Sequence, residues 1–474
     1  MSEAVDFMDA EAGPIVDPAD SHGVRETAAG LKPVLFIALE FAPIETTGAF
    51  RPLAFARHLP DFGIMPHMVS IQPDEAGRVF GAKRNDGLLA GLTGLSRMSH
   101  VSSATPVTHD SKLSQFLRIY TKLDDTFFER YRQSLAAEVD RIARQVPISA
   151  VIATAPPFGA AKLGELAAER LGVPLILDMR DAWAEWELGP SPTYFHYRAK
   201  FRGEARAFGY ASAVIATTER MQALFRRTHP GLPADKFHCI PNGFDGPLFE
   251  NSRTVACAPS GHLNVAYTGT YYYTPHKPRS LLRPHSLLQY WRKVEDWSYR
   301  SPAYFFAAMR ELRRTNPEAA DRIRFHHIGR VPPWLEQMAA EYGVADQCKF
   351  WGFVQKQDLP GVLEGMDALL ATSMKRLDGG DYFLASKTFD YLEAKKPILA
   401  FVAEGSQRDF LENSGAALIF DPDRPHDNAE RLAGLLDGSV PLMLDADFIN
   451  LYHRRNAARQ LAGLIDAVTA RTPR

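Results

Sequence analysis

Short apolar runs alternate with amphipathic stretches along most of the chain. The first run, KPVLFIALEFAP at 32–43, is continuously apolar, which is typical of a strand buried on both faces of a parallel sheet. After it, Leu53, Phe55 and Leu59 recur at helical spacing, and HMVSI at 67–71 has the composition of a second strand. The pattern predicts a unit of strand, loop, helix and strand.

The same alternation forms two series. Further strands of the first series are expected within 148–157, 173–183, 212–229 and 237–245. Strands of the second series are expected within 263–270, 322–329, 348–354, 368–373 and 397–402, with helices such as 301–315, 332–343 and 387–396 between them. Strands that alternate with helices indicate parallel sheets, so we expect two successive α/β domains of Rossmann type.

The length of 474 residues also favours two domains, because it exceeds what one hydrophobic core usually organises. The first thirty residues lack the basic and apolar regions of a signal peptide, and the insert before Arg300 is rich in aromatic and basic residues, as lids and partner surfaces often are. An insert that is merely tolerated is the alternative. The expected division is a disordered tail at 1–30, an acceptor domain at 31–245, a linker at 246–261, a nucleotide-sugar domain at 262–435 with an insert at 271–299, and a helical segment at 436–474.

Composition narrows the function classes. A formal net charge of -2 provides no long-range field that would attract nucleic acid. The three cysteines are far apart and odd in number, which argues against a zinc site or a redox pair and favours a reducing compartment. No apolar stretch is long enough to span a bilayer. The motifs HExxH, GxSxG, Walker A and GxGxxG are absent, so metalloprotease, α/β-hydrolase, P-loop and NAD-dependent dehydrogenase readings lack support.

The stretch SKTFDYLEAKKPILAF, which begins at Ser386, offers the first candidate site. A helix N-terminus attracts anions, and Lys387 adds a positive charge that suits a diphosphate. Asp390 follows three positions later and is suited to accept hydrogen bonds from ribose hydroxyls. The alternative is an ordinary surface pair of opposite charges on a helix.

Other candidates follow the expected strands, at the edge where parallel sheets bind ligands. Gly269 and Thr270 follow the strand NVAY and offer backbone that a ligand can approach closely. Arg300 begins a helix and is able to hold phosphate with two hydrogen bonds. Gly48 stands in the turn after the first strand.

A group of charged residues ends the strand of LDMRDAW. Asp178, Arg180 and Asp181 together are suited to position an acceptor hydroxyl, with Asp181 the stronger candidate. The alternative is a structural salt bridge from Arg180 to one of the two carboxylates.

Taken in order, these stretches resemble the family 4 retaining glycosyltransferases. The resemblance rests on FAPIETTGAFRPLAFARHL, VPLILDMRDAW, VIATTERM, IPNGFD, VAYTGT, RSPAYFFAAMREL, FHHIGR, KFWGFVQKQDLPGVLEGMDALLATS and SKTFDYLEAKKPILA, which cover most of 32–422. It implies the GT-B fold, in which two Rossmann-like domains face a cleft and a C-terminal helix closes the fold. It also implies transfer of a sugar, with retained configuration, from a nucleotide-diphosphate sugar to a saccharide, lipid-linked or other hydroxyl acceptor, in surface glycan or glycolipid synthesis, with neither metal nor cofactor.

The resemblance assigns roles to individual residues. Asp390 matches the family's ribose carboxylate, normally Glu, while Lys387 and Arg300 match basic positions near the diphosphate. Gly48 matches the glycine loop that faces the sugar-phosphates, and the Phe353–Val354 backbone matches the segment that lines the base. Balancing the leaving group's charge would then fall to Arg300, Lys387 and helix-end N–H groups.

The sequence departs from the family in two places. Many members carry a further glutamate that contacts the transferred sugar; here Tyr382 has that spacing, with Asp378 and Asp381 nearby as substitutes. The long insert leaves Arg279 and Arg283 as rival phosphate ligands.

Two other functions stay open: a nucleotide-sugar epimerase, and a non-catalytic binding or scaffold subunit. The expected location is the cytoplasm, with peripheral membrane contact through the insert or through the helix near 114–135 left open, and with no nucleic-acid partner.

Overall fold

The computed structural model describes residues 30–92, 97–103, 126–185, 191–257, 259, 261–271, 273, 275, 285–355, 358–438 and 440–471. The expected tail, Arg279, Arg283 and the first part of the helix near 114–135 therefore lie outside the described residues. Within the described ranges no helix combines the length and apolar character needed to cross a bilayer.

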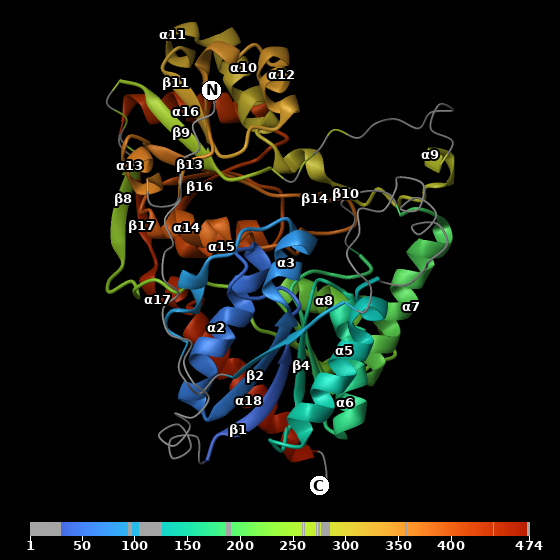
Figure 1. The fold of residues 1–474 in the computed structure, drawn as a ribbon. Coiled ribbons are helices and arrows are strands. Elements are labelled where there is room, and N and C mark those ends of the chain that lie inside the picture. The colour runs from blue at the N-terminus through green and yellow to red at the C-terminus, as the bar shows by residue number, and fades with distance from the viewer. Residues whose placement is uncertain are drawn as a thin grey trace, which may run out of the picture.

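The first domain is built on a parallel sheet of seven strands, in the order β3-β2-β1-β4-β5-β6-β7 (Figure 1). The central strands are buried on both faces, which explains their uninterrupted apolar sequences. The strands are β1 (Lys32–Ile37), β2 (Ile64–Ile71), β3 (Arg97–Val101), β4 (Val151–Ala155), β5 (Leu175–Met179), β6 (Ala213–Ala216) and β7 (Phe237–Cys239).

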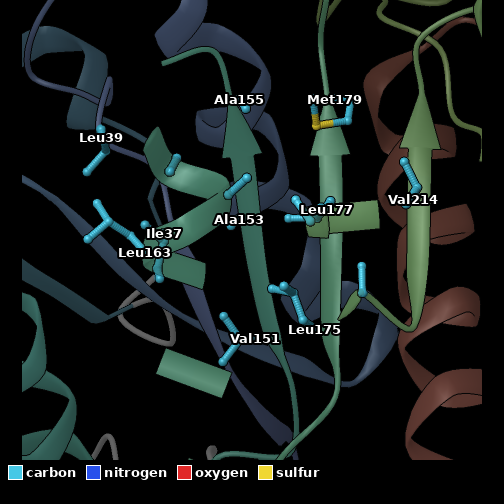
Figure 2. Packing of buried hydrophobic residues seen from close by; sticks show 14 of the residues in the cluster. Ile37, Leu39, Val151, Ala153, Ala155, Leu163, Leu175, Leu177, Met179 and Val214 are labelled. Carbon is cyan, nitrogen blue, oxygen red and sulfur yellow. The ribbon is translucent and has the colours of Figure 1, made fainter. Parts of the chain in front are cut away.

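Helices cover both faces of this sheet. They are α2 (Phe50–His58), α3 (Pro73–Phe80), α5 (Thr126–Ala143), α6 (Gly159–Leu171), α7 (Tyr194–Tyr210) and α8 (Glu219–Thr228), with short 3-10 turns η1 (Thr47–Ala49), η2 (Leu59–Phe62), η3 (Asp86–Leu89) and η4 (Ala234–Lys236). Figure 2 shows part of the core on one face, where Leu163 of α6 packs near Ile37 of β1 and Ala153 of β4. Helix α2 packs on the other face.

The second domain has a parallel sheet of six strands, in the order β12-β11-β9-β13-β15-β16. These strands are β9 (Leu263–Thr268), β11 (Ile323–Ile328), β12 (Cys348–Gly352), β13 (Ala368–Thr372), β15 (Ile398–Phe401) and β16 (Ala417–Phe420). Its helices are α10 (Ala303–Thr315), α11 (Pro317–Ala320), α12 (Pro333–Glu341), α13 (Leu359–Glu364), α14 (Lys387–Glu393), α15 (Ser406–Ser414), α16 (Pro425–Asp437) and α17 (Ala446–Asn450), with the 3-10 turn η6 (Ala345–Gln347). The expected fold class, two Rossmann-like parallel-sheet domains, is confirmed.

Two connections lie outside the two main sheets. Strand β8 (Arg253–Cys257), inside the range expected to be a linker, pairs antiparallel with β17 (Val440–Leu444), inside the range expected to be helical. The last helix, α18 (Arg454–Arg471), packs beside α2 on the first domain, so the chain ends on the domain where it began (Figure 1).

The described end of the insert is ordered against the rest of the protein. It contains α9 (His285–Leu288), β10 (Glu295–Asp296) and the 3-10 turn η5 (Trp297–Arg300). Strand β10 pairs antiparallel with β14 (Lys375–Arg376) of the second domain. Trp297 meanwhile joins the core cluster of the first domain, so this segment connects both domains.

Candidate functional site

Each sheet reverses its strand order at one point, and the residues expected to bind ligand follow the strands at those points. The first sheet reverses between β1 and β4, and the second between β9 and β13. A crevice opens at the carboxyl edge of such a reversal, because the connections leave in opposite directions. The two reversals bring Gly48 and Gly269 to ligand-binding edges of their sheets.

Three glycines end neighbouring strands of the second sheet. Gly269 donates its N–H to Ile328 O at 2.7 Å, and Gly329 donates to Gly352 O at 2.8 Å. A Cβ added to Gly329 would lie 2.6 Å from the carbonyl oxygen of Gly269, and the φ of Gly329 is +146°, so only glycine fits. Backbone without side chains is thereby presented at the edge where a ligand approaches. The sequence prediction included Gly269 but not Gly329.

Lys387, the first residue of α14, reaches this glycine edge. Its ammonium donates to the hydroxyl of Tyr267 and to Thr268 O at 3.2 Å, and it lies 4.0 Å from the centre of the Tyr267 ring. A Cβ on Gly269 would lie 3.6 Å from Lys387 Nζ. Loss of surrounding water, together with the like charge of Arg300, lowers the pKa of Lys387 to about 7. The ammonium is held in a setting that favours an anionic ligand.

The start of α14 is fixed from both sides. The N–H of Thr268 donates to the Tyr391 hydroxyl at 3.1 Å, which ties the helix to the end of β9. Gln407 of α15 accepts from the N–H of Ala385 at 2.9 Å. Ser386 and Asp390, both exposed, are carried on this fixed frame and face solvent, and the charge of Asp390 acts on Lys387.

An aromatic stack that sequence reasoning missed supports the lysine. The rings of Tyr267 and Tyr271 stack with centroids 3.8 Å apart, and the His327 ring stacks on Tyr271 at 5.5 Å. His327 is fully buried, and its pKa is lowered to about 4 by burial and by the charge of Lys387. The ring is therefore neutral and packed inside the domain. Thr270, next to the stack, is exposed.

Arg300 interacts electrostatically with charged residues of both domains. It ends η5, and its guanidinium lies 5.6 Å from the Trp297 ring centre and 5.9 Å from that of Phe383. Its positive charge lowers the pKa of Lys387 and also acts on the carboxyls of Asp381 and Asp181. The insert therefore carries an arginine that interacts electrostatically with residues of both domains.

The two upstream aspartates differ in their surroundings. Asp378 is bound by Arg376 at 2.8 Å and by Arg292 at 3.3 Å, so its charge is used within the protein. Asp381 is 1% exposed and accepts from the N–H of Phe383 at 2.8 Å; burial raises its pKa to about 7. Of the two aspartates, Asp381 is the one whose carboxyl interacts electrostatically with Arg300.

On the first domain, Gly48 is enclosed by charged side chains. Arg180 donates to the carbonyl oxygens of Gly48 and Pro156, and to Glu40 Oε2 at 3.1 Å. A Cβ at Gly48 would lie 1.9 Å from Glu40 Oε2, so the loop closes over this ion pair only because the residue is glycine. Glu40 had not been predicted, although its place just after β1 was a usable signal.

The interpretation that Arg180 binds Asp178 is wrong. Asp178, fully buried, is bound by Arg51 at 2.8 Å and accepts from the Thr154 hydroxyl at 2.8 Å. Asp181 lies beside Arg180 and forms no direct ion pair with it; burial raises its pKa, while Arg180 and Arg300 oppose that rise. Asp181 thus interacts electrostatically with an arginine of each domain, Arg180 and Arg300.

A buried network of ion pairs centred on Arg376 joins the two domains. The Arg376 side chain, 1% exposed, contacts Glu185 at 3.2 Å, Glu295 at 3.2 Å and Asp378 at 2.8 Å. Arg292 adds a second contact to Glu185 at 2.7 Å. Glu185 belongs to the first domain and the others to the second, so the network holds the two domains together. It had no signal in the sequence, because its members are far apart along the chain.

A direct hydrogen bond and an ion pair reinforce this closure. The Thr218 hydroxyl donates to Tyr382 O at 2.7 Å, and Arg220 pairs with Asp409 at 2.6 Å. Tyr382, which the sequence resemblance aligned with a sugar-contacting glutamate, donates to Glu295 at 3.0 Å. It is therefore part of the domain contact.

The expected base-lining segment lies on the rim. Phe353 is 75% exposed and Val354 is half-buried, directly after the φ +71° turn at Gly352. An exposed aromatic ring at this edge is available for stacking on a base. In the described ranges no group of three or more His, Cys, Asp or Glu side chains is arranged to hold a metal ion. Independence from metal remains a prediction.

Comparison with known families gives one match on each domain. Residues 53–243 match the model of a glycosyl transferase 4-like domain, and residues 299–450 match the model of the glycosyl transferases group 1. Together the two matches cover more than half of the chain. No curated protein matches the sequence significantly.

Solved structures share the architecture at low sequence identity. A sucrose-phosphate synthase from Thermosynechococcus elongatus has 12% identity and a TM-score of 0.54, over 93% of this chain and 96% of its own. The lipopolysaccharide outer core galactosyltransferase WaaB has 10% identity and a TM-score of 0.54, over 92% of this chain and 99% of its own. At such identities the likeness concerns the fold alone.

Proposed function

Because the chain is a GT-B glycosyltransferase with a group 1 domain, we propose that it transfers a sugar from a nucleoside-diphosphate sugar to a hydroxyl acceptor with retention of configuration. The observation that carries the donor assignment is Lys387. Its ammonium stands in a water-poor setting at the strand reversal of the second sheet, beside open glycine backbone and within the field of Arg300.

The donor would lie across the end of the second sheet. Lys387 and Arg300 would bind the diphosphate, with the backbone at Gly269 and Thr270 and the start of α14 at Ser386 close to it. Asp390 would accept hydrogen bonds from the ribose, and the Phe353–Val354 segment would line the base. Exposure of Asp390 and Phe353 supports this arrangement, because both are reachable from solvent without rearrangement.

The acceptor would approach from the first domain. Gly48 lets its loop pack against Glu40 and Arg180 because it has no side chain, and the backbone of this loop would face the sugar-phosphates. Asp181, which interacts with Arg180 and Arg300, would orient an acceptor hydroxyl. Negative charge that develops on the departing diphosphate would be stabilised by Arg300 and Lys387. The departing oxygen would then take the acceptor's proton on the same face, which accounts for retention without a protein nucleophile. Asp381 is the better placed of the two aspartates to contact the sugar.

We place this activity in the synthesis of surface glycans or glycolipids, in the cytoplasm. The location is supported by three cysteines that form no disulfide, as expected in a reducing compartment. The relatives in the structural comparison include an enzyme named for lipopolysaccharide outer core, which is consistent with such acceptors. Neither metal nor cofactor is expected.

One observation favours a second candidate, a non-catalytic subunit that binds nucleotide sugar. Asp378 is paired with Arg376 and Arg292 within the protein, and burial raises the pKa of Asp381 to about 7, so neither offers the sugar an uncommitted, fully charged carboxylate. Turnover separates the two candidates, since both predict donor binding.

The test is thermal stability of the purified protein with UDP-, GDP-, ADP-, TDP- and CMP-linked sugars. A donor that binds the native state raises the melting temperature by mass action. We expect stabilisation by one nucleotide class, lost in Asp390→Ala and kept in Lys396→Ala, a control just beyond the C-terminal end of α14. Proton NMR of the product then reports the anomeric configuration. An inverted product would overturn retention, and stabilisation without transfer to any acceptor would favour the binding subunit.

A further inference from the structure

Helix α7 and the insert meet to form one surface on the side of the molecule. Ser191, just before α7, exchanges backbone hydrogen bonds with Tyr290 of the insert at 2.8 and 3.1 Å. The Tyr290 ring lies 5.0 Å from the Tyr194 ring and 4.7 Å from the Tyr197 ring. Figure 1 shows α9 beside the start of α7, away from the sheets. We call the side chains of 194–202 and 287–293 the α7–α9 surface.

This surface exposes large apolar side chains. Phe195 is 72% exposed and Tyr194 49%, while Leu288 is 62% and Leu287 49% exposed. Four of the ten large apolar side chains that are exposed in the described part of the chain therefore lie here. Apolar side chains that stay exposed to water are unfavourable, so a partner that buried them would gain hydrophobic free energy.

The charges around the apolar side chains have one sign. Helix α7 carries Arg198, Lys200, Arg202 and Arg206, and Lys293 is exposed on the insert. The only acidic residue of α7, Glu204, is fully buried, where it accepts from the N–H of Ala184 and pairs with His229. Arg206 pairs with Glu165, whereas Arg198 and Arg202 are exposed without an acidic partner in the described ranges. The exposed face is thus basic around an aromatic centre.

We propose that the α7–α9 surface docks the protein on an anionic membrane. Aromatic rings favour the headgroup level, leucine side chains insert below it, and Arg and Lys bind anionic lipid, which is the pattern of interfacial helices. A second copy of the chain fits less well, because a two-fold contact would oppose the same arginines to each other. The sequence pointed to the insert for such contact, and the structure adds α7 as the helix that completes the surface with it.

The surface is firmly connected to the cleft. From Tyr290 the insert runs through Arg292, bound to Glu185 and Asp378, to Arg300. A membrane bound at the α7–α9 surface would therefore lie at a fixed distance from Arg300. The docking itself is independent of the proposed transferase activity, whereas the consequence that the acceptor is lipid-linked rests on it.

Flotation with vesicles tests the docking. The full chain is mixed with phosphatidylcholine vesicles, either neutral or with about 30% phosphatidylglycerol, and spun through a density gradient. We expect flotation with anionic vesicles only, lost in the double variant F195S/L288S. The double variant R198Q/R202Q should bind about 30-fold more weakly, from about 1 kcal/mol for each charge near the surface. Met443→Ser, an exposed apolar residue elsewhere, is the matched control and should float like the parent protein.

Three outcomes would overturn the proposal: no flotation of the parent protein with anionic vesicles, equal flotation of F195S/L288S, or a dimer in light scattering that F195S dissociates. The last result would assign the surface to a second copy. All variants change exposed positions, and their melting temperatures check folding. Donor-induced stabilisation should be unchanged in each variant, so failure of docking and failure of the donor assignment are read separately.

Discussion

Donor affinity should depend on pH through Lys387. In the free protein burial and Arg300 lower the pKa of this ammonium to about 7, so about half of the molecules carry the charge at pH 7. A bound diphosphate adds negative charge beside Nζ and raises the pKa. Binding therefore takes up a proton, is strongest at low pH, and is lost as the pH rises through 7 and beyond.

The size of the effect follows from the charged fraction. With a pKa of about 7 the charged fraction falls from about one half at pH 7 to about 3% at pH 8.5, so affinity should fall about 16-fold across this range. This corresponds to about 1.6 kcal/mol. The diphosphate of a nucleotide sugar does not titrate in this range, so the change belongs to the protein.

Isothermal titration calorimetry with the stabilising donor measures the dissociation constant at each pH. Buffers with different ionisation enthalpies report proton uptake, expected at about half a proton at pH 7. Lys387→Arg keeps its charge throughout and should bind with no such slope, whereas Lys387→Met should bind weakly at every pH. Lys396→Arg should retain the parent slope. A parent slope as flat as that of Lys387→Arg would refute the reasoning, since Lys387 would then be charged before the donor arrives or remote from the diphosphate.

Three further changes test the rest of the site. Gly48→Ala should lower kcat at least tenfold, since a Cβ there meets a carboxylate at 1.9 Å, while calorimetry shows donor affinity within a factor of two. Arg300→Ala should lower kcat by about 100-fold or more and, by removing a like charge, move the pH midpoint of donor binding upward, away from the parent's. Arg376→Met should lower the free energy of unfolding in urea by about 3–5 kcal/mol because it removes the buried cation that Glu185 and Glu295 share, whereas the same change at an exposed ion pair should cost below about 1 kcal/mol. Unchanged kcat in the first two variants, or unchanged stability in the third, would contradict these roles.

The two sheets were predictable because parallel strands covered on both faces need uninterrupted apolar runs, which the sequence shows plainly. Strand β3, RMSHV, escaped prediction because it lies at a sheet edge and only two of its five residues are buried. Strands β8 and β17 also escaped, since they pair outside the main sheets and β17 alternates half-buried with exposed positions. The local apolar pattern thus predicts strands that are buried on both faces. Strands that are only half-buried depend on pairing with distant segments, which the local pattern does not show.

The candidate site also contains features with a local sequence signal and features that depend on contacts between distant residues. The position of Lys387 at a helix start was predictable, because the helical pattern that begins there is a local signal, and the structure has it as the first residue of α14. The role of Arg180 was not, because its partner Gly48 is 132 positions away. The stack of Tyr271 on His327 likewise depends on strand neighbours that no spacing along the chain reveals. The roles of the site residues in donor and acceptor binding remain predictions.

The contacts between domains separate donor binding from catalysis. Arg300 and Lys387 belong to the same domain, so their mutual field persists however the domains are arranged. The electrostatic interaction between Arg300 and Asp181 joins residues of different domains, so it exists only while Arg376 and Glu185 hold the domains together. Loosening that ion pair should therefore move Asp181 out of reach of Arg300 and leave the ammonium of Lys387 unchanged. Donor affinity then reports on the second domain alone, whereas turnover requires both domains in the closed arrangement.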